Sequence, residues 1–90
     1  MIRKYLVFYG SVQGVGFRWR AHVAAQQFLC TGWVRNEWDG SVSMEIQGTE
    51  EAIDSVIRSI DKGTYVEIER IDAEVIPLID GECGFRMDYV

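Results

Sequence analysis

The sequence predicts a small α+β domain in which two helices cover one face of an antiparallel sheet. Its 90 residues suffice for one core, because folded domains cluster near roughly 100–150 residues. The composition, 48% hydrophobic and 26% charged, is typical of a globular protein. Stretches of strand and helix periodicity follow one another in the order βαββαβ, with a short strand at the end. We therefore expect residues 1–90 to form a single domain.

A strand followed by a helix is expected at the start of the chain. Residues 4–9 (KYLVFY) are rich in aromatic and branched side chains, which favour a strand that ends at Gly10. Helical spacing begins at Phe17 and extends to about Leu29, and Thr31-Gly32 supplies a stop signal. One helical face then gathers the apolar residues Phe17, Ala21, Ala24, Ala25 and Phe28.

A β-hairpin is expected next. Residues 33–36 form a short strand, and Asp39-Gly40 is the strongest turn signal of the chain. Apolar and polar residues alternate over residues 42–47, which predicts a strand with one buried face.

The second half of the chain repeats the helix-then-strand order. Thr49 can cap a helix that extends to about Ile60 and buries Ile53, Val56, Ile57 and Ile60. In a fourth strand the apolar Ile71, Ala73 and Val75 alternate with acidic residues, and a last short strand contains Phe85, Met87 and Tyr89. This order is that of a ferredoxin-like split βαβ sandwich, a fold that many unrelated activities share.

Charge and composition argue against several partners. The net charge is −5, whereas nucleic-acid-binding domains usually carry a basic field. No apolar run approaches the roughly 20 residues of a membrane span. The apolar start of the chain breaks at Gly10-Ser11 and is better explained as a strand than as a signal peptide, so we expect a cytoplasmic protein without nucleic-acid or membrane partners.

Metal and disulfide chemistry are not expected either. Cys30 and Cys83 are far apart and follow no zinc pattern, so two reduced thiols are favoured over a disulfide. His22 is the single histidine and is most simply a partly exposed helix residue. We expect neither a metal nor a cofactor.

The segment between the first strand and the first helix is suited to an anion. Its sequence, residues 10–18, is GSVQGVGFR, and its glycines permit positive φ angles at which backbone N–H groups converge. The helix N-terminus adds unpaired donors, and Arg18 can direct two hydrogen bonds at a phosphate. It is neither a Walker loop nor a dinucleotide fingerprint. A plain turn beside a surface arginine explains the spacing equally well.

Two segments resemble the signatures of the acylphosphatase family. Residues 10–18 resemble G-R-V-Q-G-V-G-F-R, and residues 32–42 (GWVRNEWDGSV) resemble G-W-V-[RK]-N-x-x-D-G-x-V. The resemblance runs on to the F-x-x-x-Y at Phe85 and Tyr89. It implies catalytic roles for Arg18 and Asn36 and a phosphate-binding loop formed by Val12, Gln13, Gly14, Val15, Gly16 and Phe17. Ser11 departs from the family, which usually has a basic residue there.

The resemblance implies a monomeric, metal-independent enzyme that hydrolyses small acyl phosphates and holds phosphate or a similar anion in the loop. One alternative is a non-catalytic domain of the same family, as found in hydrogenase maturation and carbamoyl-transfer proteins. Those domains lie inside much longer chains, so a 90-residue chain starting at methionine favours the stand-alone enzyme. An RNA-recognition domain is a more distant alternative, because residues 13–19 lack its motif.

Four further residues have two interpretations. Arg20 and Arg35 are expected to be solvated, although either could add positive potential to the loop. Trp33 is expected to pack in the core or on the sheet. For Trp38, structural filling is favoured over contact with the acyl group of a substrate.

Overall fold

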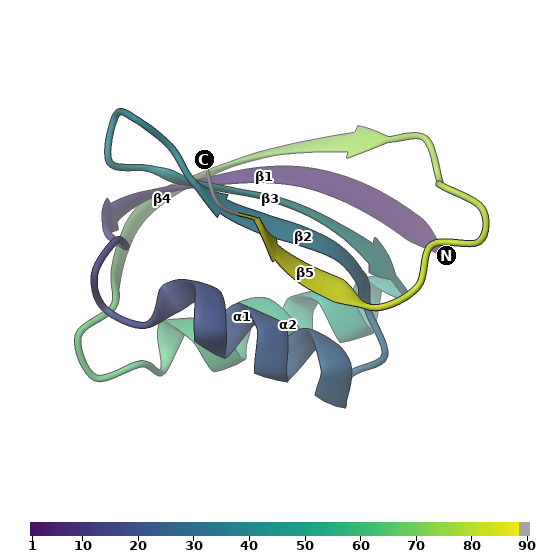
Figure 1. Ribbon diagram of the computed structural model, residues 1–90, viewed down its shortest axis with the longest axis horizontal. Helices are drawn as coiled ribbons and strands as arrows, with labels where there is room; N and C mark the ends of the chain where they lie inside the picture. Colours follow the sequence, from purple (N-terminus) through teal and green to yellow (C-terminus); the bar gives the residue numbers. More distant parts are fainter. Residues whose placement is uncertain (89–90) are drawn as a thin grey trace.

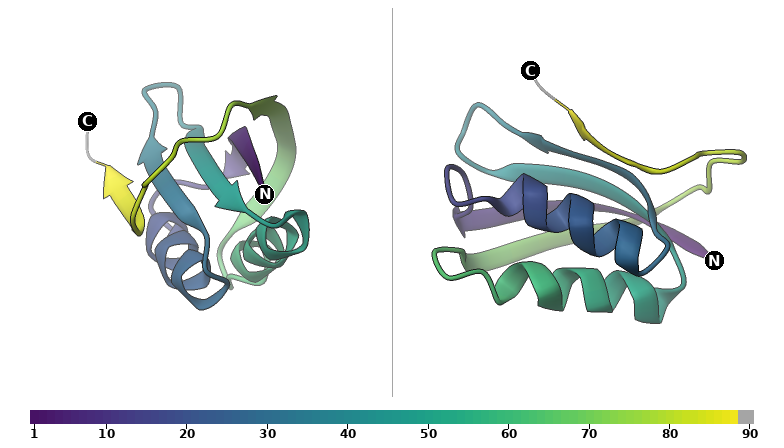
Figure 2. Two further views of the ribbon diagram at one scale, coloured as in Figure 1. Left: turned by 90° about the vertical axis from the view of Figure 1, so that its right-hand side faces the viewer. Right: turned by 60° about the horizontal axis from the view of Figure 1, so that its bottom comes forward.

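The computed structural model describes residues 1–88. One sheet of five strands has the order β4-β1-β3-β2-β5, and two helices cover one of its faces (Figures 1 and 2). The elements are β1 (Ile2–Ser11), α1 (Phe17–Gln27), β2 (Thr31–Asn36), β3 (Val42–Gly48), α2 (Glu50–Asp61), β4 (Glu67–Ile76) and β5 (Phe85–Asp88). The predicted two-layer α+β fold and its element order are confirmed.

The sheet is mixed, which corrects the expectation of antiparallel pairing throughout. β1 pairs antiparallel with β3 and β4, and β2 pairs antiparallel with β3. β5 lies at the edge and runs parallel to β2, with Gly32 opposite Phe85 and Val34 opposite Met87. Tyr89, predicted to belong to the last strand, lies outside the described residues.

The core lies between the sheet and the helices, as the apolar patterns predict. α1 buries Phe17 and three alanines, whose small side chains let the helix approach the sheet closely. Phe17 meets Phe8 of β1 edge to face, with ring centroids 4.9 Å apart. α2 buries Ile53, Val56 and Ile60, and Ile57 is partly buried against the same cluster.

α1 ends two residues earlier than predicted. Leu29 has a φ of 59°, a left-handed conformation that a helix cannot continue through. The N–H of Cys30 donates to the carbonyl of Ala25 (2.8 Å) and closes the last turn. β2 therefore begins at Thr31, and Gly32 lies inside that strand instead of terminating the helix.

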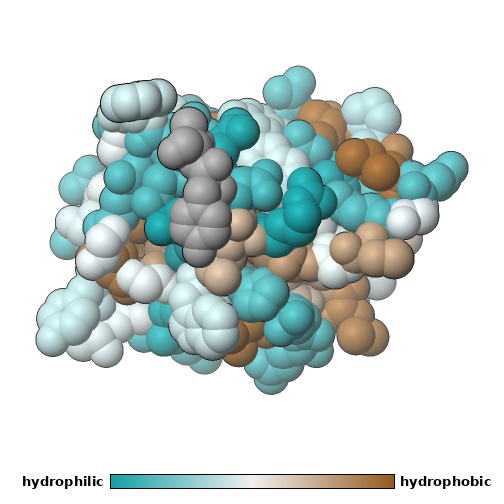
Figure 3. All heavy atoms as spheres, viewed as in Figure 1, coloured by the Kyte–Doolittle hydropathy of each residue, from teal (hydrophilic) through white to brown (hydrophobic). Residues whose placement is uncertain are grey.

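β4 does not bury the face that its alternation predicts. Ala73 is exposed, and Val75 leaves 64% of its surface accessible. β4 is an edge strand whose outer edge has no strand partner among residues 1–88, and the exposure of Ala73 and Val75 shows that the helix layer does not cover this part of its face. Apolar side chains are visible at the right-hand end of the molecule in Figure 3, towards which β4 and the connection to β5 extend.

Arg3 ties this connection to the sheet. Its side chain is fully buried, and it donates to Glu45 of β3 (2.8 Å) and to Glu82 before β5 (2.7 Å). Gln47 of β3 adds two hydrogen bonds to the backbone of Ile79. The long segment between β4 and β5 is thereby held in place without helix or strand structure.

Both cysteines are free thiols, as predicted. Cys30 is buried, which raises the pKa of its thiol, and Cys83 is exposed. Neither helix in the described part of the chain is long and apolar enough to cross a membrane.

Candidate active site

The loop between β1 and α1 lies at the same end of the molecule as the β2–β3 hairpin (Figure 1). Gly14 and Gly16 adopt φ angles of 72° and 79°, which side chains rarely tolerate. Gly16 is the N-cap of α1, and no side chain among residues 1–88 caps this helix. α2, in contrast, is capped by Thr49 and carries Glu50 and Glu51 in its first turn. Only α1 thus presents uncapped donors at a glycine-rich loop, an arrangement that suits an anion.

A cavity of about 300 Å³ opens beside this loop. It brings together six of the site residues that the sequence analysis named, and these come from the loop, α1 and β2. The complete lining is Val12, Gly14, Gly16, Phe17, Arg18, Trp19, Asn36 and Met87. The aromatic ring of Phe17 is buried in the core, so this residue anchors the loop as well as bordering the cavity.

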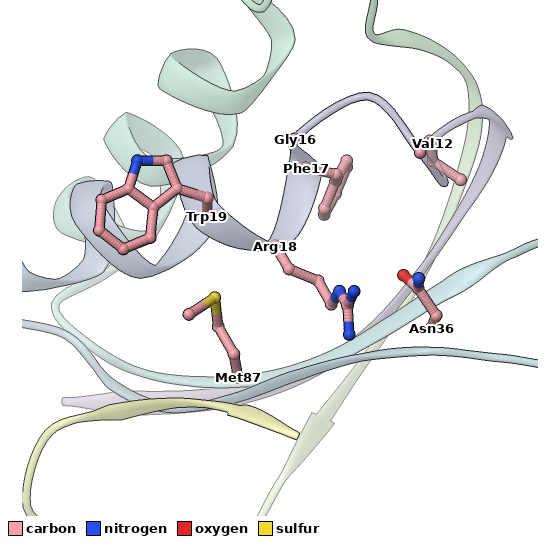
Figure 4. A pocket seen from close by; sticks show the side chains of 8 residues that line it. Val12, Gly16, Phe17, Arg18, Trp19, Asn36 and Met87 are labelled. Atoms are coloured by element: carbon pink, nitrogen blue, oxygen red, sulfur yellow. The ribbon is translucent and has the colours of Figure 1, made fainter. Parts of the chain in front are cut away.

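Arg18 and Asn36 reach the cavity from different elements. Arg18 is in the first turn of α1, and Asn36 is the last residue of β2. Their guanidinium and amide groups point towards one another (Figure 4). A phosphoryl group beside them would meet a charged two-pronged donor and an amide that can both donate and accept.

Gln13 and Val15, also predicted to belong to the phosphate-binding loop, are not among the cavity-lining residues. The side chain of Gln13 turns towards the hairpin, where its Nε2 donates to the carbonyls of Glu37 (2.7 Å) and Ser41 (2.9 Å). Val15 packs against the apolar core. Gln13 therefore connects the loop to the hairpin that carries Asn36, a function that its sequence position did not reveal.

Two carboxylates order the hairpin. Hydrogen bonds from Ser43 and Arg35 lower the pKa of Glu37, and hydrogen bonds from the hydroxyl and backbone of Ser41 lower the pKa of Asp39. Both carboxylates thus accept hydrogen bonds within the turn next to Asn36, which favours its folded conformation.

The other singled-out side chains lie away from the cavity. Arg20 donates to the carbonyl of Ser59 on α2 (3.0 Å), and Arg35 stacks on Trp33 at 4.9 Å from its ring centroid. Neither arginine lines the cavity. Trp38, in the hairpin turn, is 95% exposed, so it neither fills the structure nor borders the cavity with Arg18.

Trp19 and Met87 are cavity-lining residues that the sequence analysis did not single out. Trp19 follows Arg18 in the first helical turn, and Met87 reaches the cavity from β5. The adjacency of Trp19 to Arg18 was an available signal. Met87 had none, because its approach depends on the parallel pairing of β5 with β2.

No group of three or more His, Cys, Asp or Glu side chains within residues 1–88 could hold a metal ion. The expectation that the protein works without a metal or cofactor stays a prediction.

Comparison with known proteins agrees with this geometry. The sequence pattern of the Acylphosphatase family matches residues 4–87. An acylphosphatase of Clostridium beijerinckii is 38% identical over 90 residues, which cover 99% of this chain and all of the relative. The crystal structure of the Bacillus subtilis acylphosphatase superposes with a TM-score of 0.89 at 29% identity, covering 99% of this chain and 100% of that one.

A larger protein contains a similar unit. Full-length HypF, in a phosphate- and nucleotide-bound crystal structure, matches with a TM-score of 0.82 at 26% identity, covering 98% of this chain and 12% of that one. The family pattern and the full-length relative decide the assignment: this chain belongs to the acylphosphatase family.

Proposed function

We propose that this acylphosphatase hydrolyses carboxyl-phosphate mixed anhydrides to a carboxylate and inorganic phosphate, with Arg18 and Asn36 as its catalytic residues. The observation that carries the proposal is the convergence of both side chains on one cavity beside the uncapped N-terminus of α1. We further propose that the enzyme is a cytoplasmic monomer whose substrate is a small molecule.

The phosphoryl group is bound by local donors in a protein of net charge −5. Backbone N–H groups of residues 12–17 donate to its oxygens, and the dipole of α1 adds positive potential. Arg18 contributes a planar fork that matches phosphate geometry. These groups are in place before the reaction, so little reorganisation accompanies the charge shift of the transition state.

Asn36 positions the attacking water. Its amide oxygen accepts a hydrogen bond from the water, and its NH₂ donates to a phosphoryl oxygen, which aligns the two reactants. The water oxygen attacks phosphorus as the bond from phosphorus to the acyl oxygen breaks. The electron pair of that bond leaves with the carboxylate, and a proton of the water passes to the phosphate or to solvent.

The leaving group needs no acid. A carboxylate with a conjugate-acid pKa of about 4 departs as a stable anion. Catalysis then consists of positioning and of stabilising charge on the phosphoryl oxygens through a loose transition state. This chemistry requires neither a strong base nor a metal, and we propose that turnover is metal-independent.

The test is hydrolysis of benzoyl phosphate in EDTA. Wild-type turnover should persist in the chelator. Arg18→Ala should lower kcat/KM by about 10³-fold or more, and Asn36→Ala by about 10²–10³-fold. Arg58→Ala and Gln26→Ala, which change exposed residues of α2 and α1, are matched controls and should retain activity.

Two results would contradict the proposal. Inactivation by EDTA that a divalent metal restores would refute metal independence. A folded wild type that binds phosphate without turning over benzoyl phosphate would indicate the non-catalytic alternative. Ser11, exposed at the end of β1, would then be the first residue to replace with arginine.

A further inference from the structure

The cavity at Arg18 has two chemically different ends. Asn36 and Val12 lie on one side of Arg18, and Trp19 and Met87 lie on the other (Figure 4). Its volume of about 300 Å³ is roughly ten times the 30 Å³ share of one water molecule in the liquid. A phosphoryl group at the polar end therefore leaves space beside the apolar wall.

We propose that Trp19 and Met87 form the acyl-side wall of the site and make the enzyme prefer aromatic acyl phosphates over acetyl or carbamoyl phosphate. This inference rests on the proposed function, because it assumes that the phosphoryl group occupies the end of the cavity at Arg18 and Asn36.

Trp19 is suited to this task by its exposure. The side chain is 60% exposed although it is large and apolar, so an aromatic acyl group can remove part of it from water. Ring-on-ring contacts and contacts between a thioether and a ring add attraction beyond the buried area. Acetyl and carbamoyl groups offer much less apolar surface to these two side chains.

His22 holds the two halves of the wall together. Its ring lies 5.7 Å from that of Trp19, and its Nδ1–H donates to the carbonyl of Phe85 (2.8 Å). Phe85 is buried in β5 two residues before Met87. His22 is thus a positioning residue that joins α1 to the strand carrying Met87.

The first experiment compares benzoyl phosphate with acetyl phosphate as substrates of the wild type, Trp19→Ala and Trp38→Ala. Trp19→Ala should reduce the ratio of the two kcat/KM values about tenfold, chiefly through the KM for benzoyl phosphate. Trp38→Ala removes an equally large exposed ring outside the cavity and should leave the ratio unchanged. An unchanged ratio in Trp19→Ala overturns the inference while leaving the hydrolase proposal intact.

A binding measurement tests the wall even if no turnover is observed. In a Trp33→Phe, Trp38→Phe variant, Trp19 is the remaining tryptophan and its fluorescence reports on the cavity. Benzylphosphonate should change this emission and bind about tenfold more tightly than methylphosphonate. Equal affinities for the two phosphonates, together with unchanged Trp19 emission, would refute the role of Trp19 in an acyl-side wall.

The same assay separates positioning by His22 from a general effect on folding. His22→Ala should weaken benzylphosphonate binding and raise the KM for benzoyl phosphate with little change in kcat. His22→Gln, which retains a side-chain donor, should recover part of the affinity. Parallel losses for both phosphonates would contradict the positioning role.

Discussion

At the scale of single residues, Gln13 connects two segments that are distant in the sequence. Its amide donates to two carbonyls of the β2–β3 hairpin, from within the loop that borders the cavity. The backbone of the loop and the side chain of Asn36 are therefore aligned by one side chain that does not itself line the cavity.

Replacing Gln13 by alanine should reduce both stability and activity. Two lost hydrogen bonds correspond to about 1–3 kcal/mol of unfolding free energy. A small displacement of Asn36 should lower kcat about 10–100-fold. Urea denaturation and benzoyl phosphate hydrolysis measure the two effects. Gln13→Glu keeps the size but directs a carboxylate at two carbonyls, so it should be more harmful, and equal or better activity would contradict the assigned contact.

The residue types at the site could be predicted from the sequence more readily than their directions. Arg18, Asn36, Gly14 and Gly16, which the signature segments single out, line one cavity. The orientation of Gln13 could not be predicted, because a glutamine in a loop can face an anion or a neighbouring strand with equal local chemistry. Gln13 faces the β2–β3 hairpin because the folded sheet places the hairpin beside the loop, and local sequence does not contain that placement.

At the scale of elements, the N-terminus of α1 combines positive φ angles with an open surface. An added Cβ at Gly16 would meet nothing within 4 Å, so a substitution there acts through backbone conformation alone. Gly81, between β4 and β5, has a similar φ of 73° and equally open surroundings. The two glycines therefore form a matched pair inside and outside the site.

Gly16→Ala and Gly81→Ala should cost about the same stability, roughly 1–2 kcal/mol for a left-handed alanine. Only Gly16→Ala should also displace the donors of the loop, which should weaken phosphate binding and lower kcat/KM about tenfold or more. Thermal unfolding and phosphate titration distinguish these effects. If both variants kept full phosphate affinity, the backbone of Gly16 would have no part in anion binding.

The burial and the pairing of the edge strands depended on features that local sequence patterns do not contain. The alternation in β4 suggested one buried face, whereas the helix layer leaves Val75 of this edge strand exposed. The last strand was expected from its alternation, but its parallel pairing with β2 was not. The amphipathic helices were predicted well because their buried faces are defined by periodicity within one segment.

At the scale of the whole molecule, Arg3 and Glu82 link β1 to the segment that precedes β5. Hydrogen bonding to Arg3 lowers the pKa of Glu82 below its ordinary value of 4.5. A carboxyl whose pKa is lower in the folded state than in the unfolded state stabilises the folded protein at pH values above the unfolded-state pKa. This contribution is lost as the pH falls through the lower pKa of the folded state.

Glu82→Gln should therefore destabilise the protein in a pH-dependent manner. At pH 7 the unfolding free energy should fall by about 1.5–3 kcal/mol, the range for a hydrogen bond to a charged group. The difference from the wild type should shrink as the pH falls below 4.5. Urea denaturation between pH 3 and pH 7 measures it, with Glu74→Gln on exposed β4 as the control. A constant difference would attribute the loss to packing instead of charge.

The link between Arg3 and Glu82 also has a kinetic consequence. The two residues are 79 positions apart, and β1 lies between β3 and β4, so the centre of the sheet forms only after long loops have closed. Topologies rich in such non-local pairings fold more slowly than helical domains of similar size. The loop that follows β1 is tied to the β2–β3 hairpin through Gln13, so we expect it to be completed late in folding. A bound anion should accordingly slow unfolding far more than it accelerates folding, and should extend the lifetime of the native state.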